Sequence, residues 1–281
     1  MRTIFFLTLG ELRRRRVLIV LVALTLLFTA GVAWGFDRFA TLTRPSMPAA
    51  QFAILASQLT VMVMFMFSFV LGVTAVFVAS PAISGDVESG IALALLARPI
   101  GRADVLVGKW LASSVALVSY ALAGGALLLL VIGWTSGYAP PEPLAFLAYL
   151  AAETVVGVTF AVLLSTFVPP MAGGAIAVAC FGVAWIAGVA STVGAALDND
   201  ALVRVGTITR LVLPTDGLWR GAMFHLEPSI VLLALSGAGR GLAGNPFLAL
   251  APPPTAYLLW CVGWTAAVLA AALWVFRTRE L

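Results

Sequence analysis

The chain has 281 residues, 62% of them hydrophobic and 10% charged, whereas soluble domains are roughly 45–50% apolar. This composition excludes a water-soluble surface, so residues 1–281 are predicted to form a single all-helical membrane domain. The net charge is +4, but the arginines flank apolar segments instead of lining one polar face, which favours a role in membrane topology over nucleic-acid binding.

The N-terminal residues 1–14 are predicted to form an amphipathic helix on the membrane surface. Arg13 to Arg16 would then anchor the first span on the cytoplasmic side. A cleavable signal peptide does not fit, because the arginine cluster follows an apolar stretch and Gly31–Trp34 is a poor cleavage site.

Six segments are apolar and long enough to cross a bilayer as helices of roughly 20 residues. They are Val17–Trp34, Ala53–Ala79, Leu111–Trp134, Leu144–Phe167, Met171–Val193 and Tyr257–Phe276. Trp34, Trp134 and Trp274 lie near the ends of these spans and are expected to be interface anchors.

The basic residues near the span ends predict the orientation, because Lys and Arg accumulate in cytoplasmic loops. They place both termini and residues 80–109 in the cytoplasm, with the protein a multi-pass component of the cell membrane. The long segment 194–255 would then lie outside. Its apolar runs are too short to span and suit re-entrant or interfacial helices.

Several side chains inside the predicted spans carry separate expectations. Glu153 is a carboxylate deep in the fourth span, and such groups usually face a bundle interior or cavity. It is either a functional group in transport or a protonated group hydrogen-bonded to a neighbouring helix or to backbone. Small residues in the fifth span predict close helix packing; they are Gly173, Gly174, Gly182, Ala184, Gly188 and Thr192.

No metal or cofactor site is expected in this chain. His225 is the one histidine and is expected to be a loop residue without a role. Cys180 and Cys261 lie in apolar segments and are expected to be packing residues. The alternating methionines Met62, Met64 and Met66 are expected to pack or face lipid, since they do not share one helical face.

The loop between the second and third spans contains SGDVESGIALALLARPIGRADVLVGK, residues 84–109. Ser84 is predicted to cap a helix whose first turn holds Asp86 and Glu88. Pro99 would end that helix, and a second helix would open at Arg102 and lead into the third span. The loop is therefore predicted to form a short cytoplasmic helix across the membrane face, and Lys109 is expected to extend its charge to the lipid boundary.

These residues resemble the inner-loop signature of six-span type-2 ABC (ABC-2) transporter permeases. The matching positions are Gly85, Asp86, Gly90, Leu95, Leu96, Arg98, Pro99, Arg102, Leu106, Gly108 and Lys109. Supporting matches lie at residues 11–14, which read ELRR, and at Leu213–Arg220, so that the resemblance covers nearly the whole chain. Asp86 stands where the family commonly has glutamate, and Ile91 where it commonly has threonine.

The resemblance implies the permease subunit of an ATP-driven exporter, built from two copies of this chain and two copies of a cytoplasmic ABC ATPase. Residues 80–109 would be the coupling loop seated in the ATPase. The second and fifth spans would supply the substrate contacts at the dimer axis. ATP and Mg²⁺ would be used by the ATPase, because this chain has no GxxxxGK[ST] phosphate loop and is not expected to be an enzyme.

Two groups of candidate contact residues follow from this resemblance. The ATPase-coupling candidates are Asp86, Glu88, Gly90, Leu95, Arg98, Pro99, Arg102 and Lys109. The candidate contacts of the outer segment are Asp216, Trp219 and Arg220, and an extracytoplasmic partner of the chain is a further expectation. The alternatives are a stand-alone secondary transporter, an intramembrane enzyme, and a membrane anchor that acts through its extracytoplasmic segment.

Overall fold

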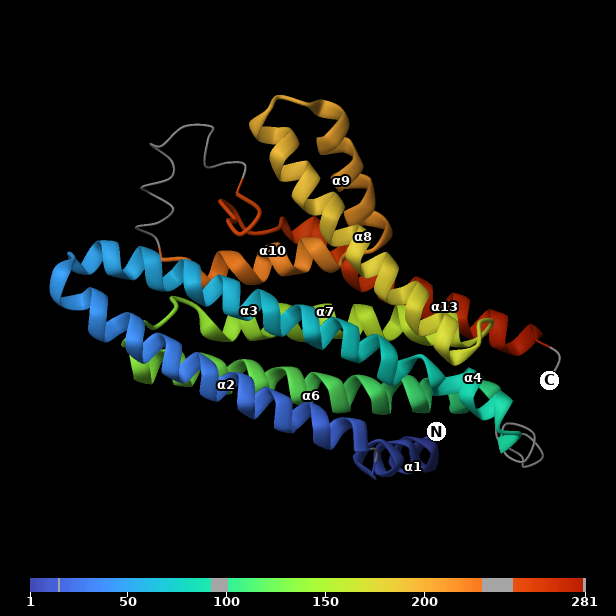
Figure 1. Cartoon of the computed structure of the whole chain (residues 1–281). Coiled ribbons are helices and arrows are strands. Elements are labelled where there is room, and N and C mark those ends of the chain that lie inside the picture. The colour runs from blue at the N-terminus through green and yellow to red at the C-terminus, as the bar shows by residue number, and fades with distance from the viewer. Residues whose placement is uncertain (15, 92–100, 229–244, 280–281) are drawn as a thin grey trace.

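The computed structural model describes residues 1–14, 16–91, 101–228 and 245–279 (Figure 1). All regular elements within these ranges are helices. They are α1 (Arg2–Arg14), α2 (Arg16–Thr43), the 3-10 helix η1 (Arg44–Ser46), α3 (Ala49–Ala79), α4 (Pro81–Glu88), α6 (Arg102–Ser136), α7 (Pro143–Ser165), α8 (Pro170–Ala196), α9 (Asp200–Val212), α10 (Thr215–Leu226) and α13 (Thr255–Thr278).

Six of the described helical stretches are long and apolar enough to cross a membrane, and they coincide with the six predicted spans. They are α2, α3 together with α4, α6, α7, α8 and α13. The first span was predicted to end at Trp34, but α2 continues to Thr43. Hydropathy falls after Trp34 because charged residues follow, yet nothing in that stretch breaks a helix.

The helices α2, α3, α6 and α7 run side by side as an elongated bundle, and α13 lies along α7 and α6 (Figure 1). Fully buried side chains such as Met64 on α3, Leu128 on α6 and Phe146 on α7 form the core between them. Gly124 on α6 permits the close approach, because a Cβ there would lie 2.6 Å from the Phe67 ring. Met62 and Met66 are about half exposed, in agreement with the packing and lipid-facing prediction.

One end of the bundle, here called the terminal end, holds the start of α1, α4, the start of α6 and the end of α13 (Figure 1). The amino group of Met1 lies 3.6 Å from the Asp104 carboxylate in the first turn of α6. At the distal end, Arg44 donates to the Ser136 carbonyl at 2.7 Å and Tyr138 donates to the Leu226 carbonyl at 2.6 Å. The two ends are therefore closed by different polar contacts.

Helix α4 differs from the helix predicted to begin at Ser84. Helix α3 ends at Ala79, Ser80 follows, and α4 starts at Pro81. Proline fits a first helical turn because its missing N–H has no partner there anyway. Ser84 is buried inside α4 and donates to the Ser80 carbonyl at 3.1 Å. Gly90, with a φ of +73°, follows the end of the helix in a conformation that glycine adopts without strain.

Segment 194–255 contains α9 and α10 in its described part. Asn199 caps α9 by accepting hydrogen bonds from the N–H groups of Ala201 and Leu202 at 3.1 and 3.3 Å. Helix α9 then packs back along α8, where a Cβ on Gly206 would lie 2.7 Å from the Ala187 carbonyl. Helix α10 packs on α7, and residues 229–244 lie outside the described ranges.

Candidate functional site

At the terminal end, Lys109 ties α6 to α4. Its ammonium is ion-paired with the Asp86 carboxylate and donates to the Ala82 carbonyl at 2.7 Å. Lys109 is only 7% exposed, so the expectation that it extends to the lipid boundary is wrong. The physical reason is that α4 offers two oxygen acceptors within reach, which satisfy a buried ammonium better than lipid could.

Arg102 ties α6 to the end of α13. Its Nη1 donates to the carbonyls of Phe276, Arg277 and Arg279 at 3.0, 3.0 and 2.7 Å. The last carbonyls of a helix have no partner within the helix, and a cation beside them also opposes the helix dipole. Arg279 in turn donates to the Thr166 carbonyl after α7 at 2.5 Å. The start of α6 is therefore fixed to the end of α13, which is itself fixed to the end of α7.

Replacing Arg102 by glutamine is expected to lower the free energy of unfolding by about 1.5–3 kcal/mol, because a charged donor to several helix-end carbonyls is lost. Thermal unfolding in detergent measures the change. Arg277→Gln is the matched control, since Arg277 is exposed in the last turn of the same helix. Equal losses in the two variants would contradict this role for Arg102.

The remaining coupling-loop candidates are placed differently. Glu88 and Gly90 are exposed at the end of α4. Leu95, Arg98 and Pro99 lie outside the described residues. Among the described candidates, Asp86 and Lys109 contact each other, Arg102 contacts α13, and Glu88 is the exposed charged side chain.

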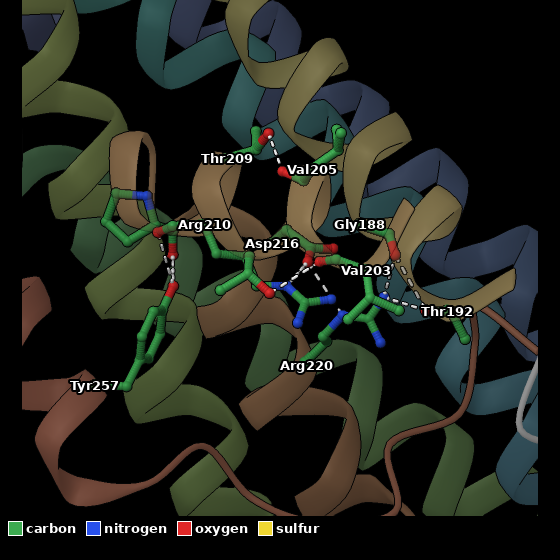
Figure 2. A network of polar contacts seen from close by, with 11 residues as sticks. Gly188, Thr192, Val203, Val205, Thr209, Arg210, Asp216, Arg220 and Tyr257 are labelled. Carbon is green, nitrogen blue, oxygen red and sulfur yellow. Dashed lines mark hydrogen bonds and ion pairs between the residues drawn. The ribbon is translucent and has the colours of Figure 1, made fainter. Parts of the chain in front are cut away.

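A second polar cluster joins α8, α9 and α10, as Figure 2 shows. Asp216 at the start of α10 accepts from Arg210 Nε at 2.7 Å and from Arg220 Nε at 3.1 Å. Arg220 Nη2 also donates to the Gly188 carbonyl at 2.8 Å and to Thr192 Oγ1 at 2.5 Å on α8. Burial lowers the pKa of Arg220, and the Asp216 charge opposes that shift. The cluster holds three helices together through one buried carboxylate.

The structure engages all three candidate outer-segment contacts, Asp216, Trp219 and Arg220, in packing within the chain. Asp216 is 5% exposed and Trp219 is 4% exposed. Trp219 packs against the Phe65 ring with centroids 5.7 Å apart, and Arg220 is committed to Asp216 and α8. The pairing with Arg210 was not predicted, although an arginine in the last turn of a short amphipathic helix is a recognisable signal.

Three aromatic side chains of α13 donate to carbonyls at the end of α9 and in the turn between α9 and α10. Trp260 Nε1 donates to the Leu211 carbonyl at 3.1 Å, and Trp264 Nε1 donates to the Val212 carbonyl at 2.8 Å. The Tyr257 hydroxyl donates to the Pro214 carbonyl at 3.2 Å. The sequence signal was the spacing of residues 257, 260 and 264, which places three polar aromatic groups on one helix face.

Packing of α8 against α10 depends on Gly188. A Cβ at this position would overlap the Asp216 carboxylate, whereas a Cβ on Gly182 of the same helix would meet nothing within 4 Å. Close helix packing, which was predicted for the small residues of the fifth span, is found at Gly173, Gly174 and Gly188. It is not found at Gly182.

The two glycines give a matched pair of variants. Gly188→Ala is expected to lower the free energy of unfolding by about 1–3 kcal/mol, because the Asp216 cluster must shift. Gly182→Ala is expected to be neutral or to raise it by up to about 1 kcal/mol, because alanine is the better helix former. Thermal unfolding of both variants checks this, and an equal response would contradict the packing.

Glu153 on α7 lies in the interior of the bundle and is 6% exposed. It accepts a hydrogen bond from Ser68 on α3 at 2.9 Å. A cavity of about 10 Å³ is lined by Glu153, Ser68, Thr215, Asp216 and surrounding aromatic side chains, which is near the lower limit for one water. The hydrogen bond between Ser68 and Glu153 joins α3 to α7, as one of the two sequence interpretations of Glu153 expects. The other interpretation, a role in transport, stays a prediction.

His225 lies in the last turn of α10, so the prediction that it is a loop residue is wrong. Its Nδ1 lies 2.6 Å from Glu142 Oε2, and its ring stacks on Tyr149 at 5.3 Å between centroids. These contacts join α10 to the start of α7. In the described ranges, no group of three or more His, Cys, Asp or Glu side chains is arranged to hold a metal ion.

A family model described as "ABC-2 family transporter protein" matches residues 3–281. The chain belongs to the ABC-2 family. It is thus an integral membrane permease component of an ABC transporter, and ABC-2 permeases generally work with ABC ATPase partners. No match to this ABC-2 protein is found among curated proteins.

Proposed function

We propose that this ABC-2 protein is the transmembrane subunit of an ATP-driven exporter in the cell membrane, working as a homodimer with two copies of a separate cytoplasmic ATPase. The ATPase binds and hydrolyses ATP with Mg²⁺, and this chain binds neither. Residues 80–109 receive the motion of the ATPase and pass it to the spans. The transported substrate contacts α3 and α8.

The observation that carries this proposal is the ion pair between Lys109 and Asp86. Helix α4 continues from α3 after Ser80, and Lys109 fixes the same short helix to α6. A force on α4 would therefore reach two spans at once. The contacts of Arg102 and Arg279 extend this connection to α13 and to the end of α7.

The exposed charge at the end of α4 supports contact with a partner at this point. Glu88 is exposed, whereas Asp86, Lys109 and Arg102 are engaged within the chain. The terminal end holds both described chain ends, and in the sequence the basic run of residues 13–16 directly precedes the first span, which favours a cytoplasmic location. An extracytoplasmic partner would then meet the distal end of the bundle.

An exposed face of α8 supports pairing of two permease copies. Val183 and Ile186 are 61% and 60% exposed, and a Cβ on the adjacent Gly182 would meet nothing within 4 Å. Small residues beside apolar ones let membrane helices approach closely. Helix α8 also contacts α10 through Gly188. In a dimer formed on this face, each α8 would therefore lie between the dimer interface and the Asp216 cluster of its own copy.

The test is purification of the tagged chain from its native membranes, followed by identification of co-purifying chains. An ABC ATPase is expected at equal amount. Glu88→Lys is expected to reduce its recovery and the ATP hydrolysis of the complex, because reversing a charge at a contact produces repulsion. Asp37→Lys is the control, since Asp37 is exposed near the end of α2 that leads into η1, and α4 does not follow there.

Each outcome is decisive for a stated part of the proposal. Recovery of the permease alone, with transport that needs no ATP, would overturn the ABC exporter mechanism. Full recovery of ATPase with Glu88→Lys, or equal losses with Glu88→Lys and Asp37→Lys, would overturn the assignment of the ATPase contact to the end of α4.

A further inference from the structure

A pocket of about 320 Å³ lies between the α9–α10 turn and the start of α13. Its walls include Thr207, Arg210 and Leu211 of α9, Arg220 of α10, Pro252–Pro254, and Tyr257 of α13. Its volume is within the range of small-ligand pockets. The role proposed above for the terminal end makes no use of it.

Positive charge exceeds negative charge at this pocket. Arg210 and Arg220 both line it, and the buried Asp216 carboxylate is their shared partner. Two guanidinium groups on one carboxylate leave a formal charge of +1. Burial lowers the pKa of Arg220 and the charge of Arg210 lowers it further, so a second anion nearby would stabilise both cations.

Arg210 has donor capacity to spare. Within the described residues it donates through Nε to Asp216, while its side chain is 25% exposed. A guanidinium presents five N–H donors in a planar fork. The Nη groups of Arg210 are therefore available to an oxyanion, whereas Arg220 already uses Nε and Nη2 for Asp216, Gly188 and Thr192.

The pocket lies at the level where a spanning helix begins. Helix α13 has 24 residues, which is about 36 Å at 1.5 Å per residue, against about 30 Å of hydrocarbon. Tyr257 in its first turn lines the pocket. The first turn of α13 is thus near the boundary between hydrocarbon and headgroups, on the side of the membrane away from the terminal end.

We propose that this pocket binds a phosphate-type anion, as carried by the headgroup of an anionic phospholipid in the leaflet away from the terminal end. Arg210 supplies a bidentate fork and Arg220 supplies the second positive charge. Leu211 and Pro252–Pro254 form the apolar wall that contacts the glycerol and upper acyl carbons. The carboxylate of Asp216 keeps the two guanidinium groups in place.

The test is native mass spectrometry of the full-length protein in a neutral detergent, titrated with phosphatidylglycerol, phosphatidylcholine or sodium phosphate in separate experiments. Arg210→Gln is expected to weaken phosphatidylglycerol binding about tenfold, because charge-assisted hydrogen bonds are lost. Thr207→Phe fills the pocket without removing a charge and is expected to weaken binding similarly. Arg204→Gln is the matched control, since Arg204 is exposed on the same helix but does not line the pocket.

The expected pattern is binding of phosphatidylglycerol over phosphatidylcholine by the wild type and by Arg204→Gln, with loss in both pocket variants. Binding of sodium phosphate that Arg210→Gln removes would support the anion chemistry and assign it to a soluble source as well. Equal binding of the two lipids by the wild type would overturn the proposal. The proposal would also be overturned if the Arg210→Gln variant and the Thr207→Phe variant each bound phosphatidylglycerol as well as the wild type does.

Discussion

Asp216→Asn is expected to lower the free energy of unfolding by about 3–5 kcal/mol, because it leaves two partly buried guanidinium groups without a countercharge. Arg210 and Arg220 would face each other with side chains only 25% and 17% exposed. Denaturant or thermal unfolding in detergent, followed by circular dichroism, measures the loss. The effect is large because one carboxylate connects α9, α10 and, through Arg220, α8.

Two further variants separate charge from general damage. Asp37→Asn removes an exposed carboxylate and is expected to change the free energy of unfolding by no more than about 0.5 kcal/mol. Adding Arg210→Gln to Asp216→Asn is expected to recover part of the loss, since one unpaired charge is then gone. A loss with Asp216→Asn no larger than that of Asp37→Asn would show that the cluster contributes little.

Lys109→Met is expected to lower ATP hydrolysis that depends on transport by about tenfold, within the usual 5–150-fold range of coupling between sites. It removes the ion pair and the hydrogen bond that fix α4 to α6. The measurement is ATP hydrolysis by the complete complex in nanodiscs, together with the amount of ATPase bound. ATPase binding is expected to persist, because Lys109 is buried behind α4.

The conservative variant Asp86→Glu keeps the negative charge opposite Lys109 and is expected to retain coupling. Asp86→Asn keeps the size and loses the charge, and it is expected to behave like Lys109→Met. If Asp86→Glu and Asp86→Asn uncouple the complex equally, the ion pair is not the element that transmits motion. If Lys109→Met releases the ATPase altogether, Lys109 acts on binding and not on coupling.

Hydropathy predicted the six spans because membrane thickness fixes how many apolar residues a crossing helix needs. It did not predict where helices end, as α2 shows by continuing from Trp34 to Thr43. Helix ends depend on breakers and caps, and Ser84 illustrates how a good capping residue can lie inside a helix. Pro81, three residues earlier, is the residue that begins α4.

The pairing of charges was beyond the reach of sequence patterns. Lys109 and Asp86 are 23 residues apart and meet only because α4 folds against α6. Arg210 and Asp216 are six apart, yet the turn between α9 and α10 had to be known before they could be paired. The sequence neighbours of these charged residues predict exposed side chains that contact a partner. In the structure the same side chains are buried or partly buried and pair with each other, which depends on how the helices pack.

The central proposal, that a separate ATPase docks at the end of α4, is tested most directly by site-specific cross-linking. Cys180 and Cys261 are first replaced by alanine, and Glu88→Cys or Asp37→Cys is introduced into that background. A thiol-reactive photo-cross-linker is then attached and activated in native membranes. An adduct with a chain that carries a GxxxxGK[ST] phosphate loop is expected from position 88 and not from position 37. No such adduct from position 88, or one from position 37 alone, would contradict the proposal.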